Sequence, residues 1–369
     1  MINVLVVDDN ARIRADLRRL LSAQKDIAVV GEASSGRQVV RTIALLKPDV
    51  VLMDADMPGM DGFETTVEVM TKAALPIIIV SASDETGTTD KAFRAMEAGA
   101  VALVALPSGT GESQGRREAE IVQTVRAMSE VRVVRRRRRA APAATPAPLA
   151  MPLPAAPVRA SRGAIDLVAI GASTGGPQTL QRLLVALPAD LAAAVVVVQH
   201  ITPDFQTSFV SWLGEATGLP VCLGEDGQVL RRATVYVAPH PFQMGVDRER
   251  RIVLRDDPPE NGLRPSVSYL FRSVAAAAPR RTVAVLLTGM GQDGASELAE
   301  LRARGAITVA QDEASSIVHG MPGEAIRLGA AMYTLPPDEI AALLISVTGA
   351  TAAGCRAAEL PRGTVGQAR

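Results

Sequence analysis

The chain has 369 residues, and its 39 lysine and arginine residues balance 39 aspartate and glutamate residues, so its formal net charge is +0. This balance gives no general attraction to nucleic acid or to a membrane surface, and 3% aromatic residues argue against base stacking on single strands. Two distant cysteines, the lack of a signal peptide and the lack of a membrane-length apolar run predict a cytoplasmic protein without membrane insertion, disulfide framework or zinc site.

Residues 1–128 alternate short apolar runs with helical patterns, which predicts a parallel sheet covered by helices on both faces. One expected helix, Arg12–Leu21, has its leucines on one face. The expected strands are Asn3–Val7, Ile27–Gly31, Val50–Met53, Ile77–Val80 and Val101–Leu106.

Polar residues follow three of these strands. Asp8 and Asp9 come after the first strand, Asp54 after the third and Ser81 after the fourth. Because the carboxyl ends of parallel strands meet at one edge, we expect the three carboxylates to converge and to form an oxygen site suited to Mg²⁺. A single loop aspartate is more often a solvated turn residue, but the set favours a metal that assists phosphoryl transfer.

With M-P-G-M-D-G after Asp54, this segment resembles the receiver domain of two-component response regulators. The resemblance implies a flavodoxin-like fold, Asp54 as the phosphorylated residue, Asp8, Asp9 and Asp54 as Mg²⁺ ligands, and Ser81 in contact with the phosphoryl group. One departure is Leu106, which stands where receivers usually have a lysine, and Leu103 occupies a nearby aromatic position. A charge-assisted hydrogen bond of about 1.5–3 kcal/mol is therefore missing. The intact acidic set still allows phosphorylation, whereas the absence of the lysine bears on how phosphorylation is coupled to a conformational change.

Residues 129–163 have the composition of a linker. Five arginines, Arg135 to Arg139, precede a block of alanine and proline from Ala140 to Pro157, which predicts an extended, semi-rigid segment. An arginine run can contact nucleic acid or an acidic surface. A solvated charge run is favoured here, because no nucleic-acid-binding fold accompanies it.

Residues 164–348 resume the α/β pattern with V-A-I-G-A-S-T-G-G-P. The predicted strand Leu167–Ile170 leads into a glycine-rich turn, and leucines at helical spacing follow from Leu180 to Leu187. Ser173 should therefore stand exposed on a tight turn beside a helix N-terminus, which suits a nucleophile whose oxyanion needs stabilisation. The loop by itself fits a phosphate or dinucleotide cradle equally well.

The residues at two further strand ends favour a hydrolase site over a phosphate or dinucleotide site. His200 follows the predicted strand Ala193–Val198, and Asp293 follows Val283–Leu287 in the glycine-rich turn T-G-M-G-Q-D-G. Each residue alone is more often structural. Together with Ser173 they would meet at one sheet edge as nucleophile, base and orienting carboxylate. His319 is expected to be structural or to support the site residues without reacting itself, and Cys222 is expected to be buried. Neither residue suggests a metal site.

The segments I-G-A-S-T-G-G-P, V-V-Q-H-I-T-P, N-G-L-R-P-S-V, L-T-G-M-G-Q-D-G and A-Q-D-E-A-S-S-I-V-H-G-M-P occur in that order. They resemble the catalytic domain of the chemotaxis protein-glutamate methylesterases, the CheB family. The resemblance implies a Rossmann-like fold, with Ser173 as nucleophile, His200 as base, Asp293 as its partner, and Thr174, Gly175 and Met290 lining the site. Gln243, Leu263 and Ser268 depart from the family pattern, outside the triad, and are expected to alter substrate fit or the interface with the receiver.

The fold class expected is therefore α/β, with two doubly wound, mainly parallel sheets. The resemblance implies a methylesterase, which also deamidates glutamine, that acts on methyl-accepting chemoreceptors. It also implies a receiver that covers the catalytic edge until a sensor histidine kinase of the CheA type phosphorylates Asp54. Mg²⁺ would serve the receiver, the esterase reaction would need no cofactor, and the protein would be a monomer with a flexible tail at 349–369. The alternatives are an esterase freed from phosphorylation control by Leu106, or a non-catalytic signalling scaffold.

Overall fold

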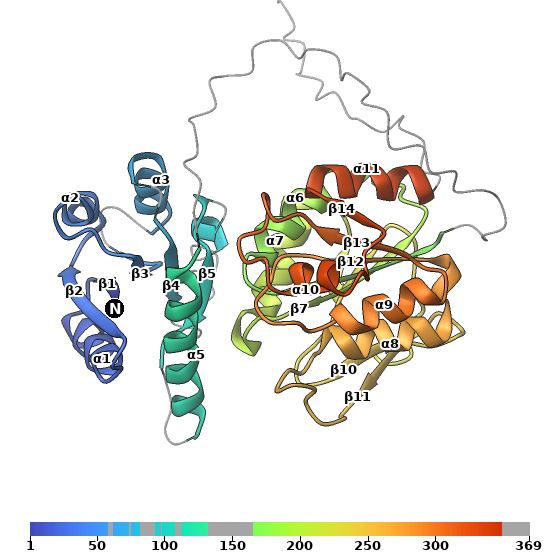
Figure 1. Cartoon of the computed structure of the whole chain (residues 1–369), viewed down its shortest axis with the longest axis horizontal. Coiled ribbons are helices and arrows are strands. Elements are labelled where there is room, and N and C mark those ends of the chain that lie inside the picture. Colours follow the sequence, from blue (N-terminus) through green and yellow to red (C-terminus); the bar gives the residue numbers. More distant parts are fainter. Residues whose placement is uncertain are drawn as a thin grey trace, which may run out of the picture.

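The computed structural model describes residues 1–57, 62–73, 75–81, 93–96, 98–107, 112–131 and 165–348, which form two α/β domains (Figure 1). The arginine run, the alanine- and proline-rich block, the C-terminal tail and most of M-P-G-M-D-G lie outside these ranges. In the described ranges, no helix has the length and apolar character needed to cross a bilayer.

The N-terminal domain is built on a parallel sheet that, in the described residues, has five strands in the order β2-β1-β3-β4-β5. Each predicted strand is confirmed to within two residues or so, because buried apolar runs bounded by polar residues leave little choice of position. The elements are β1 Ile2–Val7, α1 Ala11–Ser22, β2 Ile27–Ala33, α2 Gly36–Leu46, β3 Val50–Asp54, α3 Gly62–Lys72, β4 Ile77–Ser81, β5 Ala102–Ala105 and α5 Glu112–Ser129.

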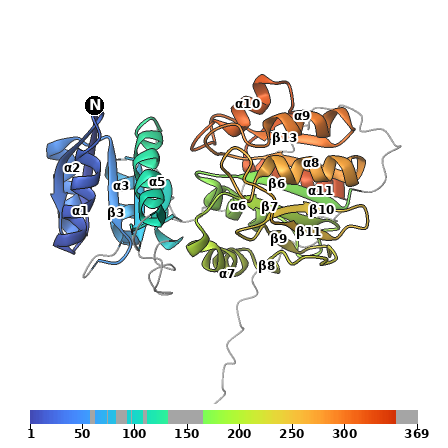
Figure 2. The same cartoon turned by 90° about the horizontal axis from the view of Figure 1, so that it is seen from below.

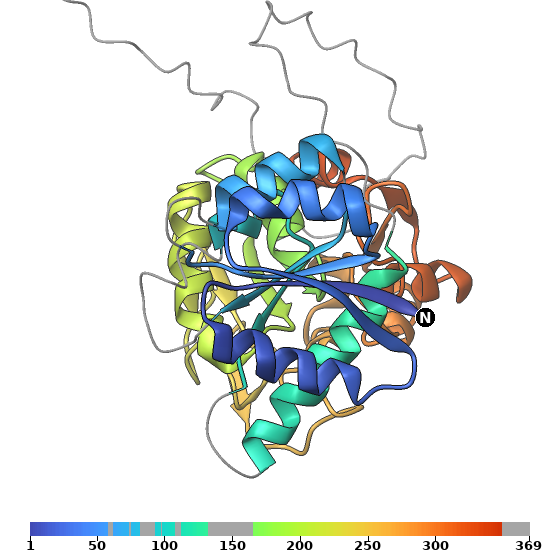
Figure 3. The same ribbon diagram turned by 90° about the vertical axis from the view of Figure 1, so that its left-hand side faces the viewer.

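Helices cover both faces of this sheet (Figure 3). Leu17 of α1 and Val125 of α5 pack on one face, while Val39 of α2 and Val69 of α3 pack on the other. Strand side chains alternate between the two apolar clusters, as expected for a parallel sheet buried on both sides. The arrangement leaves the carboxyl edge, with its aspartates, free for chemistry.

The C-terminal domain contains a larger parallel sheet, whose order in the described residues is β14-β13-β12-β6-β7-β9-β8. Its strands are β6 Leu167–Ala172, β7 Ala194–Gln199, β8 Val221–Leu223, β9 Val235–Val237, β12 Thr282–Leu286, β13 Ile307–Gln311 and β14 Tyr333–Leu335. Its helices are α6 Gly176–Val185, η1 Pro203–Phe205, α7 Gln206–Thr217, α8 Val267–Ala277, η2 Pro279–Arg281, α9 Ala295–Ala303, α10 Met321–Arg327 and α11 Pro337–Thr348.

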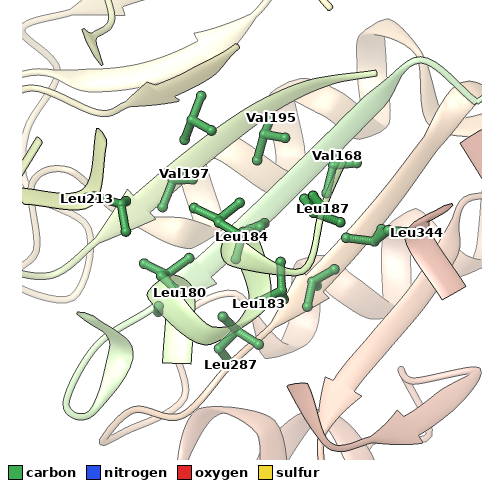
Figure 4. Close-up of a cluster of buried hydrophobic side chains, with 14 of the residues drawn as sticks. Val168, Leu180, Leu183, Leu184, Leu187, Val195, Val197, Leu213, Leu287 and Leu344 are labelled. Atoms are coloured by element: carbon green, nitrogen blue, oxygen red, sulfur yellow. The ribbon is translucent and has the colours of Figure 1, made fainter. Parts of the chain in front are cut away.

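This sheet is also covered on both sides. Helices α6, α7 and α11 pack on one face and α8, α9 and α10 on the other. Figure 4 shows Leu180, Leu183 and Leu184 of α6 against Val195 and Val197 of β7. Each of these leucines is fully buried, which stabilises the fold by about 1.5–3 kcal/mol per side chain.

An antiparallel hairpin, β10 Gln243–Val246 paired with β11 Ile252–Arg255, adds to the α8 side of the domain. The sequence pattern did not predict it, because four-residue strands carry too little periodicity. The hairpin matters for the site, since Gln243 supports the loop that leads into α8.

The topology brings the predicted site residues together. Strands β12, β6 and β7 are neighbours in the sheet and run parallel. Ser173 and His200 follow the carboxyl ends of β6 and β7, and Asp293 lies in the turn between β12 and α9. All three therefore lie at the same edge of the sheet, as predicted.

Candidate active site

The turn that carries Ser173 joins β6 to α6. Gly175 has a φ of +75°, which favours glycine, and a Cβ there would lie 2.7 Å from the Cβ of Ile317. The N–H of Ser173 donates to the carbonyl of Thr288 at 3.0 Å, and the Ser173 carbonyl accepts from the N–H of Gly176 at 2.8 Å. The turn is thus held on both sides. The serine is half-buried, not exposed as expected, because it lies in the wall of a cavity.

His200 follows β7 directly. Its N–H donates to the carbonyl of Ala172 at 3.0 Å, which fixes its backbone to the end of the neighbouring strand. The imidazole is 12% exposed, and its Nε2 lies 3.0 Å from Oδ2 of Asp293. This contact leaves Nδ1 as the nitrogen that can exchange a proton. No hydrogen bond joins Ser173 Oγ to His200 in the described structure, and such bonds commonly tighten only when substrate binds.

The carboxylate of Asp293 is held by the N-terminus of α8. It accepts hydrogen bonds from Ser266 Oγ at 2.9 Å and from the N–H groups of Val267 and Ser268 at 2.7 and 3.0 Å. Burial alone would raise the pKa of Asp293, but hydrogen bonds from His200 and Ser268 and the charge of His200 outweigh it and lower the pKa to about 2. Asp293 is therefore ionised at neutral pH and can orient the imidazole and stabilise its protonated form.

Ser173 and His200 share a cavity of about 890 Å³ that lies between the two domains. Thr174, Gly175 and Met290 also line this cavity. The side chain of Met290 is 56% exposed. The opposite wall belongs to the N-terminal domain, including residues of β5 and α5. Figure 2 shows the two domains side by side, with α5 on the side towards α6 and α7. The N-terminal domain therefore stands over the reactive edge.

Aromatic and polar contacts hold the domains together beside this cavity. Phe93 stacks on Trp212 of α7, with 5.2 Å between ring centroids. Gln178, in the first turn of α6, donates through Nε2 to the carbonyl of Met96 at 3.1 Å. Because α6 starts three residues after Ser173, the N-terminal domain contacts the same helix turn that positions the serine.

Arg117 of α5 links the two domains through an ion pair. Its guanidinium lies 2.5 Å from the Asp204 carboxylate in η1 and also donates to the carbonyl of Leu106 at 3.3 Å. Glu120 lies one turn further along α5 and lines the cavity. Burial raises the pKa of Glu120 to about 7, which Arg117 opposes and Asp204 reinforces. A titrating carboxyl group therefore lies at the domain interface.

The predicted metal ligands meet in the N-terminal domain. One carboxylate oxygen from each of Asp8, Asp9 and Asp54 lies within 4.8 Å of the others. Burial and then repulsion from Asp8 raise the pKa of Asp54 to about 7, and burial raises the pKa of Asp8 to about 6. A divalent cation would relieve this repulsion. The donor set therefore fits Mg²⁺ by both charge and oxygen chemistry.

Ser81 and Leu106 lie near that edge. Ser81 is fully buried at the end of β4, and its carbonyl accepts from the N–H of Leu106 at 3.0 Å. The Leu106 side chain packs against the apolar cluster that α5 covers, so this position supplies no cation to the edge. Leu103 is partly buried and contacts apolar clusters of both domains.

Comparison with known proteins identifies the family of each domain. The sequence profile of the CheB methylesterase family matches residues 168–344, and that of the response regulator receiver domain matches residues 4–112. The chain is 47% identical over 350 residues to a protein-glutamate methylesterase/protein-glutamine glutaminase of Geobacter metallireducens, covering 94% of this chain and 99% of that protein. The chain belongs to the CheB family.

A second full-length relative and a solved catalytic domain are also similar to this chain. A protein-glutamate methylesterase/protein-glutamine glutaminase of Syntrophus aciditrophicus is 44% identical over 352 residues, 95% of this chain and 100% of that protein. Among solved structures, the Thermotoga maritima CheB methylesterase catalytic domain is 35% identical, with a TM-score of 0.48, covering 49% of this chain and 97% of that domain. The two family profiles identify the two α/β domains as a receiver domain and a CheB methylesterase domain.

Several residues of this CheB-family chain support the site without having been predicted to do so. Gln243 and Ser268, noted only as departures from the family pattern, hold the α8 entry: Gln243 Oε1 accepts from the Ser266 N–H at 2.9 Å. Gln199 contacts the backbones of both Ser173 and His200. The sequence signal was a polar residue inside an otherwise apolar strand, V-V-V-V-Q-H.

His319 and Cys222 are the two other residues with an expectation from the sequence. His319 contacts Ser316, with 3.3 Å between Nδ1 and Oγ, and lies in the loop before α10. The expectation that Cys222 is buried is wrong. The residue is half-buried, because it lies on β8, which is an edge strand of the described sheet and pairs with β9 on one side.

Proposed function

We propose that this protein hydrolyses the methyl esters of glutamate side chains in methyl-accepting chemoreceptors. The observation that carries the proposal is the constellation at one sheet edge. Ser173 and His200 share a cavity, and His200 contacts a buried, ionised Asp293. An imidazole oriented by a carboxylate next to a serine is the arrangement required for acyl transfer. The names of the relatives support the substrate class and add glutamine deamidation.

The reaction follows from the atoms available. Nδ1 of His200 takes the proton of Ser173 Oγ as the oxygen attacks the ester carbonyl. The tetrahedral intermediate collapses, the C–O bond to methanol breaks, and His200 returns the proton to the leaving methoxide. Water, deprotonated by His200, then attacks the acyl-enzyme and releases the glutamate carboxylate with Ser173 restored. With glutamine as substrate, ammonia leaves in place of methanol.

The oxyanion of the intermediate needs donors near Ser173. Thr174 and Met290 both line the cavity, and in the described structure neither backbone N–H has a hydrogen-bond partner. We assign these two N–H groups to the oxyanion. The N-terminus of α6, which starts at Gly176, adds a favourable partial charge.

The receiver domain supplies the regulation in this proposal. Asp54 would accept the phosphoryl group, with Asp8, Asp9 and Asp54 holding Mg²⁺ and Ser81 contacting the phosphoryl oxygens. The bound cation would neutralise charge that builds up during phosphoryl transfer. A sensor histidine kinase of the CheA type would be the phosphodonor. Phosphorylation would favour domain arrangements in which the receiver no longer covers the cavity.

The domain limits proposed are 1–128 for the receiver, 129–163 for the linker, 164–348 for the methylesterase and 349–369 for a tail. The ends of α5 at Ser129 and α11 at Thr348 support these limits. We propose that the protein acts in the cytoplasm as a monomer.

The test is methanol release from methylated receptor membranes, with and without beryllofluoride and Mg²⁺, for the wild type and Ser173→Ala. We expect activity that beryllofluoride raises and that Ser173→Ala abolishes. A rate that beryllofluoride does not change would support the esterase activity but contradict its regulation by phosphorylation. The substitution of the receiver lysine by Leu106 would then be the expected cause. No activity from the wild type under any condition would contradict the substrate.

A further inference from the structure

Gln199 is the last residue of β7 and directly precedes His200. Its side chain is 2% exposed. Its Nε2 donates to the carbonyl of Ser173 at 2.8 Å and to the carbonyl of His200 at 2.9 Å. A single amide nitrogen thus joins the backbone of the proposed nucleophile to that of the proposed base.

The surroundings fix the orientation of this amide. Two carbonyl oxygens face one end of it, and only the NH₂ group can satisfy both. The other end, Oε1, lies against Gly176, where a Cβ would come within 2.0 Å of Oε1. Oε1 has no hydrogen-bond partner in the described residues. A rotation of the amide would therefore lose both hydrogen bonds and gain none.

The two hydrogen bonds of the Gln199 amide lie at the end of the pairing between β6 and β7. Strands β6 and β7 stay in register as far as Ala172 and Gln199, and beyond that pair the chains separate into the serine turn and the η1 loop. Directly after this pair, the Gln199 amide joins the two segments through the carbonyls of Ser173 and His200. A misplacement of about 1 Å between reacting groups can cost about 100-fold in rate.

We propose that Gln199 is a positioning residue that sets the separation between Ser173 and His200. This proposal rests on the proposed function, in which these two residues exchange a proton. Gly176 contributes to this positioning, because the absence of a Cβ at this residue leaves room for the Gln199 amide.

The test uses the full-length protein and phenylmethanesulfonyl fluoride, which reacts with a serine activated by a base and needs no receptor. Gln199→Met keeps the length of the side chain but removes both donors. We expect the second-order rate of Ser173 sulfonylation, followed by mass spectrometry, to fall by about 10- to 100-fold. In methanol release we expect kcat to fall with KM unchanged.

The matched control is Gln206→Met. Gln206 is 5% exposed, donates to the carbonyl of Ala238 at 3.1 Å and accepts from the N–H of His240 at 2.8 Å. In the described structure, no hydrogen bond joins Gln206 to Ser173 or His200. We expect this variant to lose thermal stability as Gln199→Met does, while Ser173 is labelled at nearly the wild-type rate. Equal labelling rates in the two variants would overturn the positioning role.

A second variant approaches the amide from the other side. Gly176→Ala keeps both hydrogen-bonding groups but pushes a methyl group into Oε1, and it is expected to slow labelling as well. If Gln199→Met does not fold, the decision rests on Gly176→Ala. Labelling of Ser173 in Gly176→Ala at the wild-type rate would then overturn the proposal. A wild-type protein that is not labelled at Ser173 would overturn the proposed function itself, which distinguishes the two failures.

Discussion

The ion pair between Arg117 and Asp204 should hold the receiver over the active site, and Arg117→Ala should weaken that hold. The side chains are 23% and 31% exposed. Exposed pairs are worth about 0.2–1 kcal/mol, and hydrogen bonds to charged groups about 1.5–3 kcal/mol. For a half-buried pair, we take about 1 kcal/mol. Since 1.4 kcal/mol is tenfold, the ratio of open to closed molecules should rise about fivefold.

The assay is the initial rate of methanol release without a phosphodonor. If the closed arrangement predominates, the rate should rise by the same factor of about five. Arg126→Ala is the matched control, because Arg126 lies on the same helix and pairs with Asp26, within the receiver, at 2.7 Å. Its unstimulated rate should not change.

A double-mutant cycle with Asp204→Asn tests whether the two residues act as a pair. Once Arg117 is absent, Asp204→Asn should add little to the rate. An unchanged or lower rate in Arg117→Ala, or two full and independent increases in the cycle, would refute the reasoning.

Three more predictions follow from the ionisable groups. Burial raises the pKa of Glu120 from 4.5 to about 7 in the closed arrangement, so its contribution to closure is fully present below pH 4.5 and is lost progressively as pH rises to about 7. The unstimulated rate of the wild type, divided by that of Glu120→Gln, should therefore increase between pH 5 and pH 7; a flat ratio over this range would contradict the prediction. Asp293→Asn should lower kcat by about 10²–10⁴-fold, because the amide cannot stabilise the protonated imidazole. A kcat of Asp293→Asn within tenfold of the wild-type value would argue against this role of Asp293 as the partner of His200. Because the pKa of Asp293 is about 2, its titration should not contribute to a fall in rate with decreasing pH above pH 4. Asp8→Asn should raise the Tm of the receiver in the absence of divalent cations, because it relieves the repulsion on Asp54, and calorimetry should then find no further rise in Tm when Mg²⁺ is added. A retained Mg²⁺ response would remove Asp8 from the metal site.

The sheets and the reactive edge were predictable because their signals are local. Apolar runs located β1 and β6 to within a residue or two, and the parallel topology then forced Ser173, His200 and Asp293 to one edge. Roles could be assigned because a serine, a histidine and an aspartate at such an edge leave few chemistries.

The support of the site was not predictable, because it depends on contacts between distant parts of the chain. Ser266 reaches Asp293 across 27 positions, and Gln199 reaches Ser173 across 26. Neither contact has a periodicity that a sequence can show. The pair between Arg117 and Asp204 spans 87 positions and two domains, so only the packing of the domains reveals it.

Trp212 gives the molecule an optical property of its own. It is the single tryptophan of the chain, it is 9% exposed, and the ring stacked on it belongs to the other domain. Any separation of the domains takes Phe93 away and brings water to the indole. Fluorescence excited at the tryptophan band should then shift to longer wavelength and become accessible to iodide. The natural protein can therefore report its own opening in real time, in a cuvette and without a label.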